Sequence, residues 1–196
     1  MILPLRIPAY EKFSDQELIE FCLANPDLGV ERDENGQLFI NMSPIFILSS
    51  YFNNEVRFEL TKWNRKYKLG KILESNTAFY LPDTSLRGPD AAFVSNEKWS
   101  TLTYEQKRSF PYLVPDFVAE IRSQSDNLKE LQNKMLKWVE NGVKLAWLID
   151  PNTKITSVYN LKGHCEDIPF DKILTGYDVL PDFSVVFSDI DRKSVV

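Results

Sequence analysis

One stretch of the chain decides the fold: Pro115-Asp116-Phe117-Val118-Ala119-Glu120-Ile121-Arg122-Ser123. Its apolar run predicts a buried β-strand over residues 116–122. Because side chains alternate along a strand, Phe117 and Ala119 should share one face of the sheet. Glu120 and Arg122 should then share the opposite face. A glutamate inside an apolar strand is a poor strand former and a poor core residue. Two interpretations follow: a salt bridge between Glu120 and Arg122 on a solvated face, or a carboxylate that ligates a metal ion.

Helical and strand patterns continue on both sides of this segment. Ser14 and Glu17 form a capping-box pattern, and Gly70 stands where a C-cap glycine would end a helix. The predicted helices cover residues 14–24, about 45–69 and 126–141. The predicted strands cover residues 28–33, 37–42, 72–81, 91–94, 144–149, 155–160 and a short segment near 184–188. Residues 96–113 are predicted to be irregular and 162–167 to be a polar loop. This order predicts one α/β (α+β mixed) domain over residues 1–196, with a mixed sheet and helices.

The composition excludes several classes of site. The 196 residues are 43% hydrophobic and carry a net charge of −5, as expected for one globular domain. One histidine (His164) and two cysteines (Cys22 and Cys165) are too few for structural zinc or a disulfide framework. No glycine-rich dinucleotide or P-loop motif is present. The 28 Asp and Glu residues make carboxylates with a hard cation the leading chemistry. Because the two cysteines could form one bridge at most, we expect a protein of the reducing cytoplasm. No membrane-spanning stretch or signal peptide is evident.

Two further residues extend the candidate site around Glu120. Asp90 follows Gly88-Pro89 and opens a predicted strand, where an ionised carboxylate is costly unless it is paired or binds a metal. A turn aspartate that hydrogen-bonds local backbone is the alternative. Lys134 borders the apolar stripe of the helix over 126–141, which Ser125 or Asp126 should cap. Its side chain could therefore reach Glu120, or it could be an ordinary lysine whose stem covers apolar surface.

The far end of the helix over 45–69 is basic. Lys62, Arg65, Lys66 and Lys68 lie there, with Glu59 as the opposing charge. One interpretation is a solvated face whose cations suit a helix C-terminus. The other is a phosphate-contacting patch that binds nucleic acid.

Taken together, these residues resemble the PD-(D/E)XK nuclease superfamily and, more closely, the Uma-type family of bacterial restriction endonucleases. The segments that carry the resemblance are residues 75–82, 88–91, 115–126, 131–135, 141–143, 147–151 and 180–183. The resemblance implies a restriction-endonuclease-like core, in which helices flank a mixed central sheet and Mg²⁺ sits at the strand ends, with Mn²⁺ as an alternative. An N-terminal helix and hairpin, predicted from the sequence itself, would precede this core.

The resemblance also assigns roles to residues at matching positions. Asp90 and Glu120 match the two metal-binding acids. The superfamily lysine belongs two residues after the second acid, but Arg122 stands there. Arginine stays protonated and cannot act as a general base, although it can neutralise a phosphate. Lys134 matches the lysine that such families supply from the following helix.

Two residues receive supporting roles. Gln132 would orient a water molecule or a phosphate. Glu55, on the first long helix, resembles an additional glutamate that some members use near the metal, and a solvent-facing helical glutamate is an equal alternative.

These observations lead to competing hypotheses of function. The first is a Mg²⁺-dependent endonuclease that hydrolyses phosphodiester bonds of DNA. The resemblance implies that such an enzyme works as a homodimer, because two active sites cut two strands. The second is a catalytically lapsed module of the same fold that binds nucleic acid or a protein partner, motivated by Arg122 at the lysine position. A third and weaker hypothesis is a hydrolase of small phosphoesters.

Overall fold

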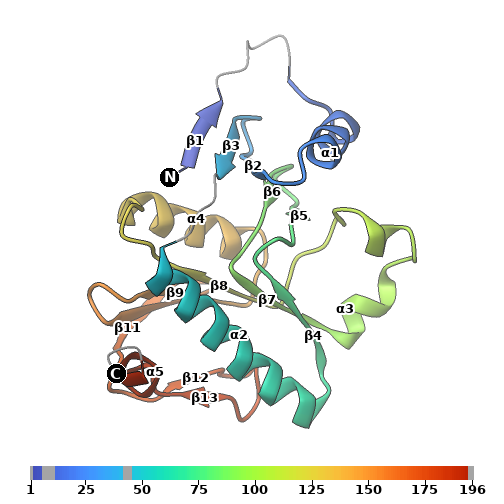
Figure 1. The fold of residues 1–196 in the computed structure, drawn as a ribbon. Helices are drawn as coiled ribbons and strands as arrows, with labels where there is room; N and C mark the ends of the chain where they lie inside the picture. The colour runs from blue at the N-terminus through green and yellow to red at the C-terminus, as the bar shows by residue number, and fades with distance from the viewer. Residues whose placement is uncertain (1, 6–11, 42–45, 194–196) are drawn as a thin grey trace.

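The computed structural model describes residues 2–5, 12–41 and 46–193, and a six-stranded mixed sheet forms its centre (Figure 1). The spatial order of its strands is β11-β10-β9-β8-β7-β4. β8 and β9 run parallel, and the other neighbours are antiparallel. The strands are β4 (Gly70–Glu74), β7 (Ala91–Ser95), β8 (Phe117–Ile121), β9 (Leu145–Asp150), β10 (Ile155–Asn160) and β11 (Gly163–Pro169). The predicted mixed α/β fold is confirmed.

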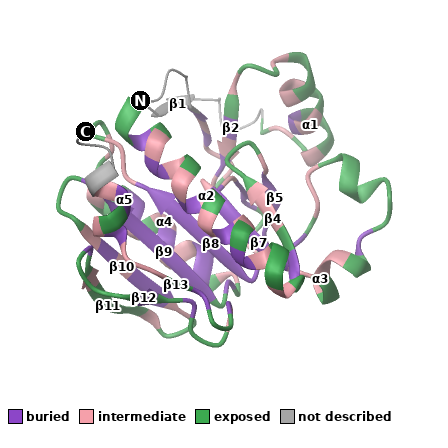
Figure 2. Cartoon of the chain, turned by 60° about the horizontal axis from the view of Figure 1, so that its bottom comes forward, coloured by how far each residue is buried: buried purple, intermediate pink, exposed green. Residues whose placement is uncertain are grey.

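Helices cover both faces of this sheet, which explains why β8 and β9 are buried along their whole length (Figure 2). Helix α2 (Ile47–Tyr67) packs its apolar stripe against the face that carries Phe117 and Ala119. Helix α4 (Leu128–Glu140) packs against the opposite face, which carries Val118. The parallel pair needs a crossover connection, and α4 supplies it between β8 and β9. The alternation predicted for residues 116–122 is therefore confirmed.

A second, antiparallel sheet stands at the N-terminal side of the molecule (Figure 1). Its strand order is β1-β3-β2-β6-β5, and helix α1 (Asp15–Ala24) contributes Leu18 to its core. The strands are β1 (Ile2–Leu5), β2 (Gly29–Arg32), β3 (Leu38–Asn41), β5 (Phe79–Tyr80) and β6 (Leu86–Arg87). Only Gly88, Pro89 and Asp90 separate β6 from β7, so the chain passes from one sheet directly into the other.

The remaining elements are short. They are α3 (Asn96–Thr101), a 3-10 helix η1 (Gln106–Arg108), the β12 (Leu174–Thr175) and β13 (Ser184–Val185) pair, and α5 (Phe187–Lys193). Among the described residues, no helix combines the length and the apolar character needed to cross a bilayer.

Several predicted boundaries are confirmed and others are wrong. The capping box of Ser14 and Glu17 is present at the start of α1. The predicted start of the next helix, Ile45, lies outside the described residues. That helix does not end at a glycine cap, because Lys68 itself adopts the left-handed conformation (φ 56°). Gly70 instead begins β4, where an added Cβ would lie 2.1 Å from the carbonyl oxygen of Val94. The glycine thus permits close contact between strands.

Three further predictions are corrected by tertiary pairing. Asn127, and neither Ser125 nor Asp126, caps α4 by accepting hydrogen bonds from the backbone N–H groups of Lys129 and Glu130. The predicted strand over 72–81 is divided between β4 and β5, which belong to different sheets. The predicted polar loop over 162–167 is largely the edge strand β11, which is polar because it pairs only with β10 and faces solvent.

Candidate active site

Asp90 and Glu120 lie opposite each other on two adjacent strands. Ala91 pairs with Ala119 and Ala92 with Val118, so extending the antiparallel register by one residue places Asp90 beside Glu120. Directly opposed residues project from the same face of a sheet. The backbone N–H of Ile121 donates a 2.6 Å hydrogen bond to Oδ2 of Asp90, which joins the two strand ends. Both carboxylates consequently lie on the face that α4 covers.

Glu120 is a buried carboxylate, only 4% exposed. Trp138 donates its indole N–H to Oε1 of Glu120 at 3.0 Å, and Nζ of Lys134 lies 2.9 Å from the same oxygen. The alternative of a Glu120–Arg122 salt bridge on a solvated face is therefore wrong. The predicted reach of Lys134 along the sheet toward Glu120 is present in the structure.

Lys134 has three acceptors around its ammonium group. Its Nζ donates to Oε1 of Glu31 at 2.8 Å and to the carbonyl oxygen of Gly88 at 3.0 Å, in addition to its contact with Glu120. Three acceptors match the three donors of an ammonium group. Residues from β2, from the segment before β7, from β8 and from α4 thus converge on one nitrogen atom.

Burial governs the electrostatics of this cluster. Desolvation raises the pKa of both Asp90 and Glu120 above the ordinary range, and their mutual repulsion adds to the effect for Glu120. Burial alone would lower the pKa of Lys134, but the carboxylates of Glu120 and Glu31 outweigh it and raise that pKa. Two desolvated carboxylates at one place favour a bound cation, because a cation offsets the cost of their charge.

Comparison with known proteins gives the family. The profile of Uma2, described as "Putative restriction endonuclease", matches residues 15–190. The chain belongs to the Uma2 family. A similar solved structure is that of a protein from Anabaena variabilis ATCC 29413, described as a putative nuclease belonging to DUF820. It is 17% identical and has a TM-score of 0.69, over 83% of this chain and 89% of the other. This likeness shows a shared fold. No curated protein matches the chain.

Within this Uma2 protein, Glu31 is the site residue that sequence reasoning missed. It belongs to β2 of the N-terminal sheet and lies 103 positions before Lys134 in the chain. Nothing in the local pattern of β2 separates Glu31 from a solvent-facing strand residue. Only the packing of the N-terminal sheet against α4 brings its carboxylate to the ammonium group.

Arg122 occupies the usual lysine position of the superfamily but does not join the cluster. Its Nη1 forms a 2.8 Å ion pair with Oδ2 of Asp150 at the end of β9. Its guanidinium also contacts the carbonyl oxygen of Asp126 at 3.4 Å, in the segment before α4. No described contact links Arg122 to Asp90, Glu120 or Lys134. Arg122 therefore links the end of β9 to the segment before α4. This structural role differs from the catalytic role expected from its sequence position.

Gln132 and Glu55 are not drawn into the cluster by any described contact. Gln132 is half-buried on α4 and forms no side-chain hydrogen bond within the described part of the chain. Glu55 lies on α2, which packs on the sheet face opposite Glu120. Among the described residues, no group of three or more His, Cys, Asp or Glu side chains is placed to hold a metal ion. Glu55 therefore does not form a three-ligand set with Asp90 and Glu120.

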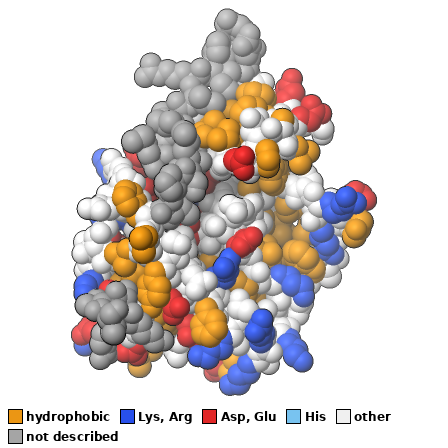
Figure 3. Space-filling model, in the orientation of Figure 1, with side chains coloured by type: hydrophobic (Ala, Val, Ile, Leu, Met, Phe, Trp, Pro, Cys, Tyr) orange, Lys and Arg blue, Asp and Glu red, His pale blue; other side chains and the backbone are white. Residues whose placement is uncertain are grey.

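The basic residues of α2 lie at the other end of β7. Gly70, just after the helix, pairs with Ser95, whereas Asp90 precedes Ala91. Five residues of strand separate these ends by about 16 Å. Figure 3 shows Lys and Arg side chains gathered over this end of the molecule. The predicted nucleic-acid-binding residues there are Lys62, Arg65, Lys66 and Lys68.

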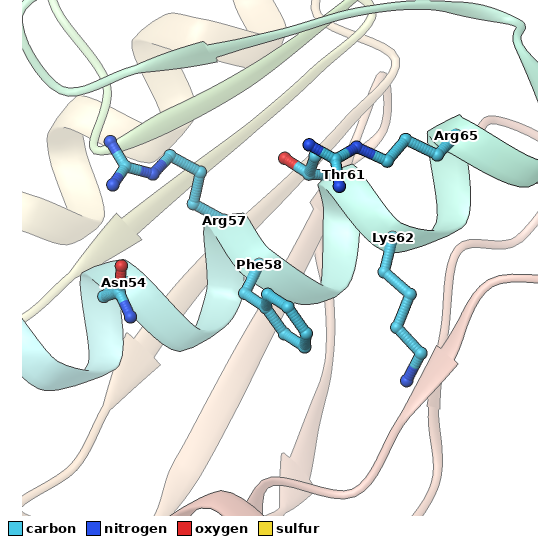
Figure 4. A pocket seen from close by; sticks show the side chains of 6 residues that line it. All are labelled: Asn54, Arg57, Phe58, Thr61, Lys62 and Arg65. Atoms are coloured by element: carbon cyan, nitrogen blue, oxygen red, sulfur yellow. The ribbon is translucent and has the colours of Figure 1, made fainter.

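A shallow hollow accompanies these cations on the outer side of α2. It is lined by Asn54, Arg57, Phe58, Thr61, Lys62 and Arg65 (Figure 4). Arg57 and Arg65 extend along one side of the helix, and Phe58 and Lys62 along the other. Two of the cations already have acidic partners: Arg57 pairs with Glu74 at 2.6 Å and Lys62 with Glu59 at 3.2 Å.

The donor set of the cluster fits a hard divalent cation. Trp138 and Lys134 both meet Oε1 of Glu120, and Ile121 meets Oδ2 of Asp90, so the described hydrogen bonds leave one oxygen of each carboxylate unused. Mg²⁺ is typically bound by one or two carboxylates, with water and substrate phosphate completing its shell. Two carboxylates therefore match the requirement of Mg²⁺, and Mn²⁺ accepts the same oxygen ligands.

Proposed function

We propose that this Uma2 protein is a divalent-metal-dependent endonuclease that hydrolyses phosphodiester bonds of DNA. One observation carries the proposal. Asp90 and Glu120 lie side by side on the sheet face that α4 covers, and the ammonium group of Lys134 lies 2.9 Å from Glu120. A pair of acids beside a fixed cation suits a substrate that carries a phosphate and gains negative charge in the transition state. Membership of the Uma2 family supports the same reaction class.

In this proposal the residues of the chain have separate tasks. Asp90 and Glu120 would hold Mg²⁺, or Mn²⁺ in its place. The bound ion supplies Lewis-acid stabilisation of phosphate charge and acidifies a water molecule. Lys134 would neutralise charge on the phosphate as an ammonium group, a form that its contacts with the carboxylates of Glu31 and Glu120 favour. Gln132 is proposed to orient substrate or water from the same helix.

We propose that Lys62, Arg65, Lys66 and Lys68 contact the nucleic acid at a distance from the reacting phosphate. The end of β7 that pairs with Gly70, just after these residues, is about 16 Å along the strand from Asp90, which is within the span of a duplex that covers several base pairs. Loss of two cations, as in Lys62→Ala with Arg65→Ala, should weaken DNA binding uniformly across sequences and flatten its salt dependence. A homodimer, in which two sites cut two strands, belongs to the same proposal and is tested by light scattering.

A lapsed nuclease that binds nucleic acid or a protein is the second candidate. Arg122 at the superfamily lysine position favours it. The ion pair of Arg122 with Asp150 weakens this argument, since it gives Arg122 a use in the fold while Lys134 provides the ammonium group at the acids.

The experiment is cleavage of supercoiled plasmid and of single-stranded DNA by the full chain in Mg²⁺, in Mn²⁺ and in EDTA. We expect nicking or cutting with either metal and none in EDTA. Lys134→Met should reduce the rate by about 10²–10³-fold, the usual effect of removing one group that stabilises transition-state charge. Lys137→Met, one helical turn further along α4, is the matched control and should cut at the rate of the wild type. DNA binding without any cutting would support the second candidate.

A further inference from the structure

Two ion pairs connect the N-terminal hairpin to α4. Glu31, on β2, binds Lys134 at 2.8 Å, and Glu34, in the turn that follows, binds Lys137 at 3.2 Å. The two lysines are one helical turn apart, and the two glutamate side chains are similarly exposed, at 28% and 30%. Only the first pair touches the acids of the active site, because Lys134 also contacts Glu120.

The surroundings of Lys134 change when a divalent cation engages Glu120. In the structure its ammonium group has two carboxylates and the carbonyl oxygen of Gly88 as partners. A cation held by Glu120 would withdraw part of that negative charge and add positive charge nearby. The Lys134 side chain is only 15% exposed, so solvent compensates little. Without Glu31, a largely buried ammonium group would keep only the Gly88 carbonyl oxygen and Oε1 of Glu120, whose carboxylate charge would already be shared with a divalent ion, which is unfavourable.

The backbone around Gly88 leaves room for this contact. An added Cβ at Gly88 would lie 3.2 Å from the carbonyl oxygen of Thr77 and 3.9 Å from Oε1 of Glu31. A side chain at Gly88 would therefore crowd the carbonyl oxygen of Thr77, whereas its distance from Glu31 would be an ordinary contact. The chain reaches Asp90 two residues later, so the same segment places an acceptor for Lys134 and one acid of the site.

We propose that Glu31 is a positioning residue of the active site, which holds Lys134 in place and balances its charge while Glu120 binds the cation. The inference rests on the proposed function. It makes the N-terminal sheet part of the active site, since the second carboxylate that contacts Lys134, that of Glu31, belongs to that sheet. Glu31 acts through Lys134 and is not proposed to touch the metal or the substrate.

The first test measures Mg²⁺ binding by calorimetry to the metal-free full chain. Glu31→Gln keeps the size of the side chain and removes its charge, and Glu34→Gln makes the same change at the neighbouring ion pair. We expect Glu31→Gln to weaken Mg²⁺ binding by about 10–100-fold, as is typical for loss of a group that supports metal ligands. Glu34→Gln should bind Mg²⁺ as the wild type does. Glu31→Ala gives the same comparison if the amide disturbs folding, which thermal unfolding reports.

The second test needs no metal. The rate at which acetic anhydride acylates Lys134 is measured by mass spectrometry of proteolytic peptides, relative to the exposed Lys144. Glu31→Gln removes the negative charge that favours the ammonium form of Lys134, so Lys134 should react faster in Glu31→Gln and at the wild-type rate in Glu34→Gln.

The outcomes separate this inference from the function on which it rests. A wild-type protein that binds no Mg²⁺ would overturn the proposed function and the role of Glu31 with it. A wild-type protein that binds Mg²⁺, with unchanged affinity and unchanged Lys134 reactivity in Glu31→Gln, would overturn the inference alone. Weakened binding and faster acylation in Glu31→Gln, with neither in Glu34→Gln, would establish it.

Discussion

Trp138 donates its indole N–H to Oε1 of Glu120 at 3.0 Å, so a fully buried aromatic side chain supports the carboxylate that is expected to bind the metal. Its neighbour in size and burial, Trp147, packs on the other face of the sheet, and its Nε1 has no hydrogen-bond partner among the described residues. The two tryptophans thus differ in whether the indole N–H donates a hydrogen bond to a carboxylate of the site.

This difference gives a prediction with an internal control. Trp138→Phe removes the hydrogen bond to Glu120 and should weaken Mg²⁺ binding by about 10-fold or more. Trp147→Phe removes similar volume without a hydrogen bond and should leave Mg²⁺ affinity unchanged. Calorimetry on both variants, with thermal unfolding to confirm the fold, makes the comparison. Equal losses in the two variants would mean that the indole N–H of Trp138 does not support the site.

Arg122 is predicted to act on stability and not on the reaction. Arg122→Ala leaves the carboxylate of Asp150, 6% exposed, without its guanidinium partner. Breaking a buried pair in this way costs about 3–5 kcal/mol of unfolding free energy. Lys154→Ala, which removes an exposed partner of Asp191, should cost less than about 1 kcal/mol. Urea denaturation measures both values.

The catalytic side of the Arg122 prediction uses a milder variant. Arg122→Lys keeps a positive charge but loses the second arm of the guanidinium, so it should destabilise the protein while the cleavage rate of the folded fraction stays near that of the wild type. A rate that falls by 100-fold or more in a stable Arg122→Lys protein would instead place Arg122 at the substrate.

Asp116 predicts a pH dependence of stability. Burial opposes its ionisation, but a hydrogen bond from Lys144, the backbone N–H of Ser95 and the charge of Lys98 outweigh burial and lower the pKa of Asp116. A carboxylate with a lowered folded pKa stabilises the protein above its unfolded pKa of about 3.9, and the stabilisation is lost as the pH falls through the folded value.

Asp116→Asn should therefore lower the unfolding free energy at pH 7 by about 1.5–3 kcal/mol. The gap between variant and wild type should close as the pH is lowered below the ordinary pKa of aspartate. Urea titrations at pH 7 and at successively more acidic pH values provide the measurement. A gap that stays constant across this range would show that the charge of Asp116 is not the cause.

The sequence predicted the parts of the site that local periodicity determines. Strand alternation placed Glu120 on the face that α4 covers, and helical spacing placed Lys134 at the edge of the buried stripe of that helix. Asp90 followed from its position one residue before a buried strand, once the strand pairing of Ala91 with Ala119 is formed. These features need only the repeat of a strand or helix and one contact between neighbours.

Contacts between distant segments could not be predicted in this way. Glu31 reaches Lys134 from another sheet, and Asp150 forms an ion pair with Arg122 from the end of β9, the parallel neighbour of β8. Neither acid has a signal in its local sequence that would reveal its partner. The prediction that Gly70 caps the helix is wrong for a related reason. A glycine after a helix resembles a cap, but the close approach of the Val94 carbonyl, which is a tertiary contact, explains it.

The most direct test of the central claim is cleavage of plasmid DNA by the wild type, Asp90→Asn and Glu120→Gln over a titration of Mg²⁺. Both substitutions keep the shape of the side chain and remove the charge that is proposed to hold the cation. We predict Mg²⁺-dependent cutting by the wild type, loss of cutting in both variants, and retained DNA binding in all three. Wild-type rates in both variants, or cutting that is unaffected by EDTA, would contradict it.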